Sequence, residues 1–326
     1  MMVWKKLLNG MKKNYRINKN KKAIVIFGAN SYIATCLISK LSKKKEFKIF
    51  FVARNKISIA NSFTYKNLNK LQLNLNKNFN KIFFYNFACN TNVEDYLKNR
   101  KLTIKNVFSY QKIILDFSNK INNSTFILVS SDRVFGKLNK IAYPSSIPKP
   151  IDPYAITKFK IENYFKKYLK NQFIIIRATN VYGPNQKSKQ LLPKIIEQTK
   201  NFSSEIHVGN LNSFRDYIYI DDLIDGLIKI LRINDKKNLI FHFSNKKIYL
   251  KSIINHINSY FLKKNIDKKI ISSKDNFRKS KFELGNFKLA CYSSYNKLCW
   301  SAKTDFFKGL NKILNNEFKK FKKTNR

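Results

Sequence analysis

Residues 126–164 read FILVSSDRVFGKLNKIAYPSSIPKPIDPYAITKFKIENY, and this stretch decides the fold. Residues 126–129 are a short, wholly apolar run, which is typical of a strand buried on both faces of a parallel sheet. The polar residues 130–132 would then lie at the carboxyl end of that strand, where open α/β sheets bind their ligands. A loop punctuated by prolines follows, and a helix opens with the pattern Tyr154-x-x-x-Lys158. The stretch therefore predicts a strand, a loop and a helix, with a polar site at the strand end.

The spacing of Tyr154 and Lys158 places both side chains on one helical face, one turn apart. A tyrosine phenol titrates at about pH 10 and is a poor base at neutral pH, but a neighbouring lysine cation favours the ionised form and lowers the phenol pKa. A hydroxyl from Ser131 can hold the same substrate oxygen, which gives a proton-transfer group suited to oxidising an alcohol or reducing a carbonyl. In a lysine-rich chain this spacing also arises by chance on a surface helix, so its value comes from its position behind the Ser-Ser strand end.

Further upstream, a strand, a glycine turn and a helix occur in the order that is typical of dinucleotide-binding folds. Residues 23–27 (AIVIF) form the strand, Gly28 permits the tight turn, and Ala34 is small enough for close packing of helix on strand. The helix expected over residues 32–41 would offer its N-terminal amides to a pyrophosphate. Ser31 stands where a glycine is usual, so its side chain must point away or hydrogen-bond a phosphate. The candidate cofactor residues of this part are Gly28, Asn30, Ser31, Tyr32, Ile33, Ala34 and, after a later strand, Ala88.

A second strand is expected over residues 48–53, and Arg54 follows it. In NAD enzymes of this fold an acidic residue at this place receives the ribose hydroxyls of the adenosine. The chain has no carboxylate there, and a guanidinium can pair bidentately with a 2′-phosphate. The sequence therefore favours NADP over NAD as the cofactor, although Arg54 also fits a solvated charge at a strand end.

Strands and helices alternate along the first part of the chain, which predicts an α/β fold with a doubly wound parallel sheet. Further strands are expected over residues 82–88 and 173–176, and a long helix over residues 103–119, whereas residues 61–81 carry no clear pattern. The later chain is less regular and predicts a smaller, mixed α/β region. We expect a basic N-terminal extension over residues 1–22, a Rossmann domain over residues 23–182 to which residues 214–235 return, and a substrate-binding domain over residues 183–213 and 236–326.

The charge balance is strongly basic, with 65 Lys and Arg against 19 Asp and Glu for a net charge of +46. Such a balance normally indicates nucleic acid. Here the excess is overwhelmingly lysine, lies in every segment and accompanies much Asn, Ile and Phe, which is typical of A/T-rich coding sequence and not of a phosphate-binding patch. We therefore expect no specific nucleic-acid partner, and a non-catalytic nucleic-acid-binding protein on this fold is a remote alternative.

The cysteines and histidines show no spacing that is typical of a metal site or a disulfide framework. The four cysteines are expected to be reduced thiols in a cytoplasmic protein. No apolar run reaches the roughly 18 residues that a membrane span needs, and residues 1–22 lack the apolar core of a secretory signal. These patterns predict a cytoplasmic protein with neither a metal site nor a membrane span.

Five short motifs lie in order along residues 22–315. They are Gly28-x-x-Ser-x-x-Ala34, Ser130-Ser-Asp-Arg-Val-Phe-Gly136, Pro153-Tyr-Ala-Ile-Thr-Lys158, Arg177-Ala-Thr-Asn-Val-Tyr-Gly-Pro184 and Arg215-Asp-Tyr-Ile-Tyr-Ile-Asp-Asp222. In this order and spacing they resemble the extended short-chain dehydrogenase/reductases, specifically the NAD-dependent epimerase/dehydratase family that modifies nucleotide sugars. The resemblance implies a Rossmann domain with bound NAD or NADP, a nucleoside-diphosphate-sugar substrate, and a homodimer formed through the helices near residues 103–119 and 154–170.

The resemblance also implies roles for the residues of the catalytic motifs. Ser131 matches the catalytic serine or threonine of the family. Tyr154 matches its acid/base, and Lys158 matches the residue that binds the nicotinamide ribose and tunes the tyrosine. The three residues are thus expected to be catalytic, with Tyr154 and Lys158 also in contact with the cofactor.

On the substrate side, Asn180 and Arg215 match positions that contact the sugar nucleotide in the family. Arg215 suits a diphosphate through its planar guanidinium, and its alternative role is an ion pair with Asp216 or Asp222. Arg278 is a further candidate for a phosphate contact, in a segment that matches the family poorly.

Asp132 and Arg133 bear on the reaction type. Sugar 4,6-dehydratases that resemble this chain commonly follow the catalytic threonine with Asp-Glu, in which Asp is the acid and Glu the base for water elimination. Arg133 replaces that Glu and cannot be a base, but some cytidine-linked dehydratases carry Ser/Thr-Asp-Lys at these positions. Residues 209–215 are also similar to a loop of guanosine-linked sugar enzymes. We expect an NAD(P)-dependent nucleotide-sugar epimerase or 4-keto reductase acting at C4 of the hexose, with a 4,6-dehydratase that uses Asp132 as the alternative.

Overall fold

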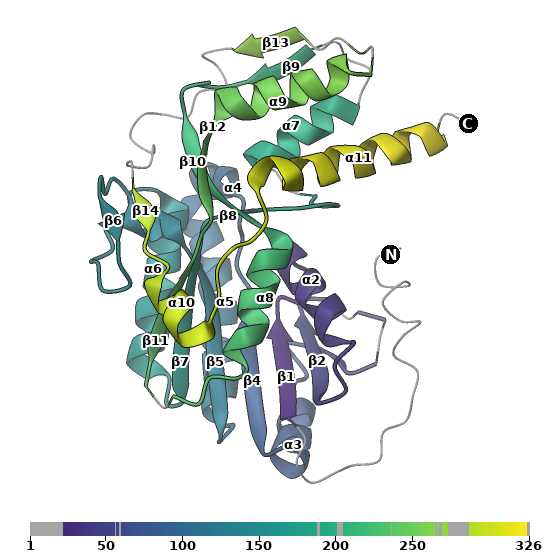
Figure 1. The fold of residues 1–326 in the computed structure, drawn as a ribbon. Coiled ribbons are helices and arrows are strands. Elements are labelled where there is room, and N and C mark those ends of the chain that lie inside the picture. The colour runs from purple at the N-terminus through teal and green to yellow at the C-terminus, as the bar shows by residue number, and fades with distance from the viewer. Residues whose placement is uncertain are drawn as a thin grey trace.

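A seven-stranded sheet forms the centre of the molecule, with the strand order β11-β7-β5-β4-β1-β2-β3 and every neighbouring pair parallel. The order reverses between β1 and β4, and at such a switch point the strand ends open a crevice for a ligand. The strands are β1 (Lys22–Phe27), β2 (Phe47–Ala53), β3 (Ser62–Thr64), β4 (Lys81–Asn86), β5 (Ser124–Ser131), β7 (Gln172–Ala178) and β11 (Leu239–Phe243) (Figure 1). The computed structural model describes residues 22–55, 57–58, 60–187, 190–200, 205–235, 237–264, 266, 269–272 and 287–324.

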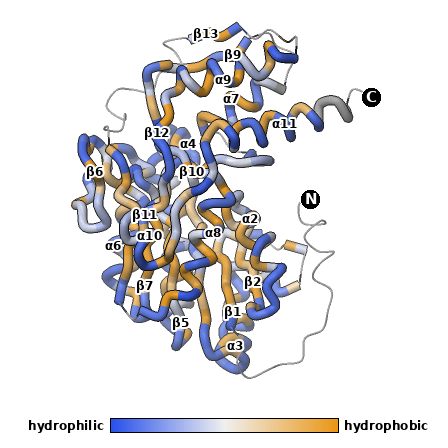
Figure 2. Tube along the Cα trace, in the orientation of Figure 1, coloured by the Kyte–Doolittle hydropathy of each residue, from blue (hydrophilic) through white to orange (hydrophobic). Residues whose placement is uncertain are grey.

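Helices cover both faces of this sheet, which is why its strands are unbroken apolar runs in the sequence. Successive residues of β1 point alternately into two apolar cores, Ile24 into the first and Val25 into the second. The first core is closed by α2 (Tyr32–Leu41) and α8 (Ile220–Ile230), and the second by α3 (Leu68–Asn78), α5 (Arg100–Asn119) and α6 (Pro153–Tyr168). Figure 2 shows the hydrophobic residues concentrated along the strands of the sheet, with hydrophilic residues at the loops around it.

Smaller sheets and helices stand beyond the carboxyl ends of the large sheet (Figure 1). They comprise a three-stranded sheet of β8 (Asn180–Tyr182), β10 (Phe214–Tyr219) and β12 (Lys246–Tyr249), the strand pairs β9 (Glu205–Val208) with β13 (Lys269–Ser272) and β6 (Ile141–Ala142) with β14 (Lys288–Leu289), and the helices α4 (Val93–Lys98), α7 (Leu191–Lys200), α9 (Leu250–Leu262) and α11 (Phe306–Thr324). A further helix, α10 (Tyr292–Leu298), packs against β11 and α8.

Asp222 joins the segment before α11 to the large sheet's helix α8. The Trp300 indole N–H donates to the Asp222 carbonyl oxygen at 2.9 Å, and the Thr304 amide donates to the Asp222 carboxylate at 3.0 Å. Both Trp300 and the backbone around Asp222 are buried, so these bonds fix the path of the later chain over the first core.

The parallel α/β fold is confirmed, and two segments differ from what the sequence indicated. Residues 61–81 contain β3 and α3, because Leu68, Leu71 and Leu75 recur at helical spacing within an Asn- and Lys-rich stretch. Leu239–Phe243, which we assigned to the substrate-binding domain, instead extends the large sheet as β11, since it pairs with β7 along five residues. The rest of the domain division stays a prediction. The N-terminal extension up to residue 21 and Arg278 lie outside the described residues.

Among the helices that the structure describes, none is both long and apolar enough to cross a bilayer.

His242 of β11 is fully buried, and its ring contacts that of Phe135 edge to face at 5.5 Å between centroids. Burial, helped by the nearby Arg177 guanidinium, lowers the pKa of His242 to about 3. An unfolded chain titrates its histidines at about pH 6.5. Between these two values the unfolded state binds a proton that the folded state does not, so this contribution to stability is full above pH 6.5 and is lost as the pH falls toward 3.

We expect the free energy of unfolding to fall by about 2 kcal/mol between pH 7.5 and pH 5 because of His242. Denaturant unfolding at the two pH values measures this loss, and the variant His242→Phe should show a smaller one. His207→Gln is the matched control, since the His207 ring is about half exposed, and it should retain the wild-type dependence. An equal loss in the wild type and in His242→Phe would contradict the assignment.

Candidate active site

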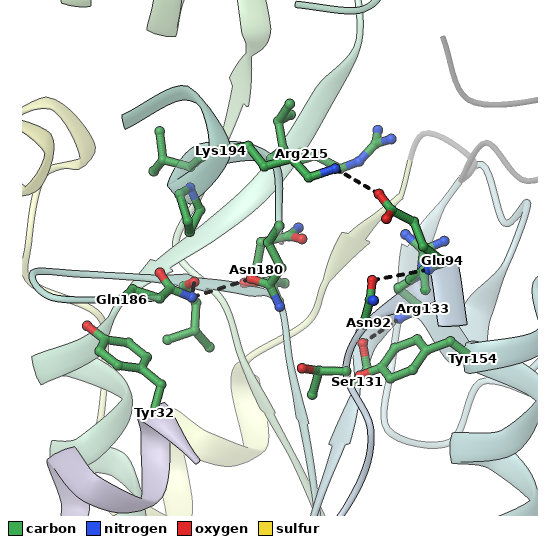
Figure 3. A pocket seen from close by; sticks show the side chains of 18 of the residues that line it. Tyr32, Asn92, Glu94, Ser131, Arg133, Tyr154, Asn180, Gln186, Lys194 and Arg215 are labelled. Atoms are coloured by element: carbon green, nitrogen blue, oxygen red, sulfur yellow. Dashed lines mark hydrogen bonds and ion pairs between the residues drawn. The ribbon is translucent and has the colours of Figure 1, made fainter. Parts of the chain in front are cut away.

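A cavity of about 1480 Å³ lies over the carboxyl ends of β1, β4, β5 and β7, between the large sheet and the smaller sheets beyond it (Figure 3). The structure brings most of the predicted site residues together there. Its lining includes Asn30, Ser31, Tyr32, Ile33, Ser131, Asp132, Tyr154, Lys158, Asn180 and Arg215. Four other predicted residues, Gly28, Ala34, Arg54 and Ala88, lie outside this lining.

Ser131, Tyr154 and Lys158 converge in the cavity from two elements. Ser131 ends β5, whereas Tyr154 and Lys158 lie in the first two turns of α6. The Lys158 ammonium donates a hydrogen bond to the Val129 carbonyl oxygen at 2.9 Å and lies 5.9 Å from the centre of the Tyr154 ring. The phenol is in hydrogen-bonding contact with Ser131, and Figure 3 shows the two side chains next to each other.

Opposing influences act on the ionisation of the Tyr154 phenol. Burial raises its pKa, Lys158 lowers it, Cys89 raises it, and Arg133 and Ser131 lower it, with a net result above 10. The effect of the lysine predicted from the sequence is present, but burial outweighs it. Burial also acts to lower the pKa of Lys158, yet its contacts with Cys89 and Tyr154 leave it raised, so this side chain stays cationic. At neutral pH the phenol therefore carries its proton beside a permanent cation.

Asp132 lies directly after the strand end and is buried in the wall of the cavity. Burial raises its pKa to about 6, although the Arg133 guanidinium and a hydrogen bond from the Ser131 hydroxyl at 3.0 Å lower it in part. A carboxyl group that titrates so close to neutrality can give up a proton during a reaction. Asp132 is thus a second acid in the site, next to Ser131.

Arg133 and Asp152 form a buried ion pair at the edge of the site. The Arg133 guanidinium donates to one Asp152 oxygen from Nε at 3.0 Å and from a terminal nitrogen at 2.5 Å. The other Asp152 oxygen accepts the Ala155 amide at 2.9 Å and so caps the N-terminus of α6. Asp152 is completely buried, and Pro153 follows it at the first helical position, where a missing N–H costs nothing. The helix that carries Tyr154 thus begins on a carboxylate held by Arg133.

Cys89 and Tyr96 complete the surroundings of the phenol. The Cys89 thiol lies 3.6 Å from the Tyr96 hydroxyl and also contacts Lys158. The Tyr96 ring meets the Tyr154 ring edge to face at 5.8 Å, while its hydroxyl donates to the Asn90 carbonyl oxygen. The loop between β4 and α4, together with α4, therefore packs against Tyr154 and Lys158.

The turn after β1 is tight and leads directly to the N-terminus of α2, an arrangement that suits a pyrophosphate. Gly28 has φ of +74°, and a Cβ on it would lie 2.8 Å from the Phe87 carbonyl carbon and the Ala88 nitrogen. Only glycine fits such a turn. Ser31 caps α2, since its hydroxyl oxygen accepts the Ala34 amide at 3.3 Å. The hydroxyl hydrogen of Ser31 can still be donated to a phosphate at this helix N-terminus.

Two hydroxyl groups of the cavity wall lack protein partners. The side-chain oxygens of Ser130 and Thr179 are buried and have no hydrogen-bond partner among the residues that the structure describes. They lie at the ends of the neighbouring strands β5 and β7. Buried polar groups are normally satisfied, so together with the turn at Gly28 these atoms fit a polar ligand such as a dinucleotide or a sugar.

Asn180 and Arg215 line the opposite side of the cavity. The Asn180 side-chain amide donates to the Asp216 carbonyl oxygen at 2.9 Å, and Arg215 donates to the Phe214 carbonyl oxygen. The Asp216 carboxylate accepts the Ser244 hydroxyl at 2.6 Å, and the Asp222 carboxylate accepts the Thr304 amide. Both acidic groups that the sequence offered as partners of Arg215 thus have other hydrogen bonds.

An ion pair spans the cavity from one side to the other. The Lys194 ammonium of α7 contacts the Glu94 carboxylate of α4 at 2.7 Å (Figure 3). Both side chains are about half exposed, so the pair contributes little to stability. Its position links α4 to α7.

The model of the NAD dependent epimerase/dehydratase family matches residues 24–242, which are 219 of the 326 residues. The chain belongs to this family. Its seven-stranded sheet and the site at the end of β5 and the start of α6 lie within the matched residues, except for the first two residues of β1 and the last residue of β11.

Two curated relatives of the chain are nucleotide-sugar enzymes by name. The chain is 30% identical over 189 residues to a dTDP-D-glucose 4,6-dehydratase of Dictyostelium discoideum, an alignment that covers 52% of this chain and 43% of that protein. It is 26% identical over 324 residues to a trifunctional UDP-glucose 4,6-dehydratase/UDP-4-keto-6-deoxy-D-glucose 3,5-epimerase/UDP-4-keto-L-rhamnose-reductase of Arabidopsis thaliana, covering 90% of this chain and 47% of that protein. The chain spans less than half the length of these relatives.

Solved structures share the fold of this chain. A UDP-glucuronic acid 4-epimerase from Bacillus cereus in complex with UDP-glucuronic acid and NAD superimposes with a TM-score of 0.77 at 19% identity, over 91% of this chain and 99% of that chain. RMD from Pseudomonas aeruginosa complexed with NADPH gives 0.71 at 14% identity, over 90% and 98%. At these identities the likeness establishes the fold.

Sequence reasoning did not place three residues, Asp152, Cys89 and Tyr96, around Tyr154. Asp152 had a readable signal, because an Asp directly before a Pro at the start of a helix is the pattern of an N-cap. Cys89 and Tyr96 had none, since they meet Tyr154 only when the loop after β4 folds back over α6. Arg54 follows β2 and is exposed. The assignment of Arg54 to a 2′-phosphate therefore stays a prediction.

Proposed function

We propose that this chain is an NAD(P)-dependent nucleotide-sugar enzyme, an epimerase or 4-keto reductase that acts at C4 of the hexose. The observation that carries the proposal is the convergence of Ser131, Tyr154 and Lys158 in one cavity. The cavity extends from the turn after β1, which fits a dinucleotide, to Arg215 on the smaller sheet.

In the proposed mechanism, Tyr154 transfers a proton to or from the sugar hydroxyl while Ser131 hydrogen-bonds the same oxygen. The pKa of Tyr154 lies above its ordinary value, so at neutral pH the phenol carries the proton that the reduction of a carbonyl consumes. Lys158, anchored on the Val129 carbonyl, holds a positive charge beside the phenolate that this donation leaves, and the same phenolate takes up the proton when an alcohol is oxidised. A bound nicotinamide supplies the redox chemistry by exchanging a hydride with the sugar carbon.

The substrate is proposed to lie with its sugar against Ser131 and its diphosphate toward the smaller sheet. Asn180 and Arg215 line that part of the cavity, and a guanidinium matches a diphosphate in charge and shape. Dimerisation through α5 and α6 belongs to the same proposal. It is supported by the exposure of Leu102, Ile113 and Tyr168 on these helices.

A 4,6-dehydratase is the second candidate, and Asp132 is the observation that favours it. This carboxyl group is buried beside Ser131 with its pKa raised to about 6, which suits an acid that protonates a departing hydroxyl. The relative from Dictyostelium discoideum carries that activity in its name. Arg133 stands against it, because its guanidinium is paired with Asp152 and cannot take up a proton.

NADP is proposed as the cofactor in preference to NAD on the basis of Arg54. Replacing it, as Arg54→Gln, is expected to weaken NADPH binding by about 10-fold or more, since a charge-assisted hydrogen bond to the 2′-phosphate is lost. The affinity for NADH should stay unchanged, and fluorescence titration measures both. Arg100→Gln, at an exposed arginine at the start of α5, is the matched control. Equal affinities of the wild type for both dinucleotides would contradict the preference.

The proposed function has a direct test that needs no assumed substrate. Mass spectrometry of small molecules that co-purify with the protein should detect a nicotinamide dinucleotide or a nucleoside-diphosphate sugar. In parallel, NADH and NADPH are titrated against the purified chain by fluorescence. Failure of both dinucleotides to bind would remove the proposed mechanism.

A further inference from the structure

The first turn of α6 is fixed from outside the helix, and this anchoring involves charge. Asp152 uses one carboxylate oxygen to cap the helix at Ala155 and the other to receive two donors of the Arg133 guanidinium. Arg133 belongs to the short 3-10 turn at residues 132–135, directly after the strand end that presents Ser131. The pair therefore couples the two elements that supply the hydroxyl and the phenol of the proton-transfer group.

Tyr154 is the second helical residue after this anchor, so a shift of the first turn displaces the phenol directly. Arg133 also lines the cavity, and Figure 3 shows it between Tyr154 and Asn92. Its positive charge favours the ionised phenol and the ionised form of Asp132. The charge of Asp152, which is completely buried against Arg133, opposes that influence.

We infer that Arg133 and Asp152 act together as the positioning pair of the site, which holds Tyr154 against the end of β5 and sets the net charge beside its phenol. The expected effect of this pair on kcat rests on the proposed function, whereas its role in anchoring α6 does not. It also gives Arg133 a role at the position where the common dehydratases that this chain resembles have a glutamate. The other groups that face Tyr154 are Lys158 on α6, Cys89 after β4, Tyr96 on α4 and Ser131 at the end of β5.

Two single substitutions distinguish an effect of the pair on Tyr154 from a contribution to the stability of the fold alone, because they remove charges of opposite sign. Arg133→Gln leaves the Asp152 carboxylate without its cation and should move the pH at which Tyr154 ionises upward by on the order of one unit. Asp152→Asn keeps an oxygen for the helix cap but removes the negative charge that opposes Arg133. It should therefore move the pH at which Tyr154 ionises downward by a similar amount. The double variant, which is neutral at both positions, should return close to the wild-type value.

The readout is the pH dependence of kcat, together with one that needs no turnover. Tetranitromethane attacks phenolates, so its rate of nitration of Tyr154, followed by peptide mass spectrometry across pH, reports the ionised fraction. Arg133→Lys keeps the charge but loses the two-donor geometry, and should lower kcat without moving either profile. If no nucleotide sugar is turned over, the proposed function fails, while the nitration profiles still decide the inference.

The Arg177–Glu162 pair provides a matched control, because it joins Glu162 of the same helix to Arg177 of β7. It is also buried, with 2.8 Å between a guanidinium nitrogen and a carboxylate oxygen. Arg177→Gln should destabilise the fold as Arg133→Gln does, yet leave the Tyr154 profiles in place. The inference is overturned if Arg133→Gln and Asp152→Asn shift the profiles in the same direction, or if neither shifts them.

Discussion

Replacing Tyr154 with phenylalanine is expected to lower kcat by about 100- to 10,000-fold, the usual contribution of a general acid or base. The substitution removes the only atom of this side chain that can move a proton and leaves the ring, which packs edge to face on Tyr96, in place. Binding of the dinucleotide should persist, because Lys158 keeps its hydrogen bond to the Val129 carbonyl. The measurement is kcat with a set of nucleoside-diphosphate hexoses, accompanied by cofactor titration.

Tyr164→Phe provides the control for this experiment. Tyr164 lies on the same helix, contacts Phe108 and does not line the cavity. Substitutions away from a site usually change the free energy of unfolding little, so the same chemical change at Tyr164 should leave kcat within about two-fold of the wild type. Full activity of Tyr154→Phe would disprove the proton-transfer role and, with it, the proposed reaction.

Asp132→Asn is expected to separate the two candidate reactions. An asparagine oxygen can still accept the hydrogen bond from Ser131, so the geometry of the strand end is kept while the transferable proton is lost. Any 4,6-elimination should then fall by about 100-fold or more. Epimerisation or reduction at C4, which depends on Tyr154, should largely survive.

The pH dependence of the wild type adds a second discriminator. If Asp132 is the acid of an elimination, its protonated form must react, and the rate should decline as the pH rises through about 6. An epimerase or reductase has no such requirement at Asp132. A rate that is flat across this range in the wild type, combined with unchanged turnover in Asp132→Asn, would remove the dehydratase.

Much of the fold was predictable because its strands are buried on both faces. Residues 23–27 and 126–129 are apolar throughout, and glycine or serine follows each at the point where the parallel strands end. The spacing of Tyr154 and Lys158 then fixed two members of the site on one face of α6. These features are local in sequence, which is why one amino-acid sequence was enough to predict them.

The remainder depended on contacts between distant segments. The pKa of Tyr154 is raised and not lowered, because burial by the loop after β4 outweighs Lys158, and no local pattern records burial. The pairing of Arg133 with Asp152 joins residues separated by a long loop. The placement of Leu239–Phe243 in the large sheet depends likewise on a strand partner more than sixty positions away in β7.

The chain returns to the large sheet only late in the sequence, with α8 and β11, and this order constrains how the protein folds during its synthesis. Ile24 and Ile26 of β1 are sheltered by α8, and β7 gains its outer neighbour only when β11 has been added. A nascent chain that has passed β7 but not α8 leaves the part of this apolar face that α2 does not cover open to water, and such surfaces favour aggregation. Because these closing contacts link the start of the fold to residues beyond 220, the sheet cannot be completed until the ribosome has made most of the chain.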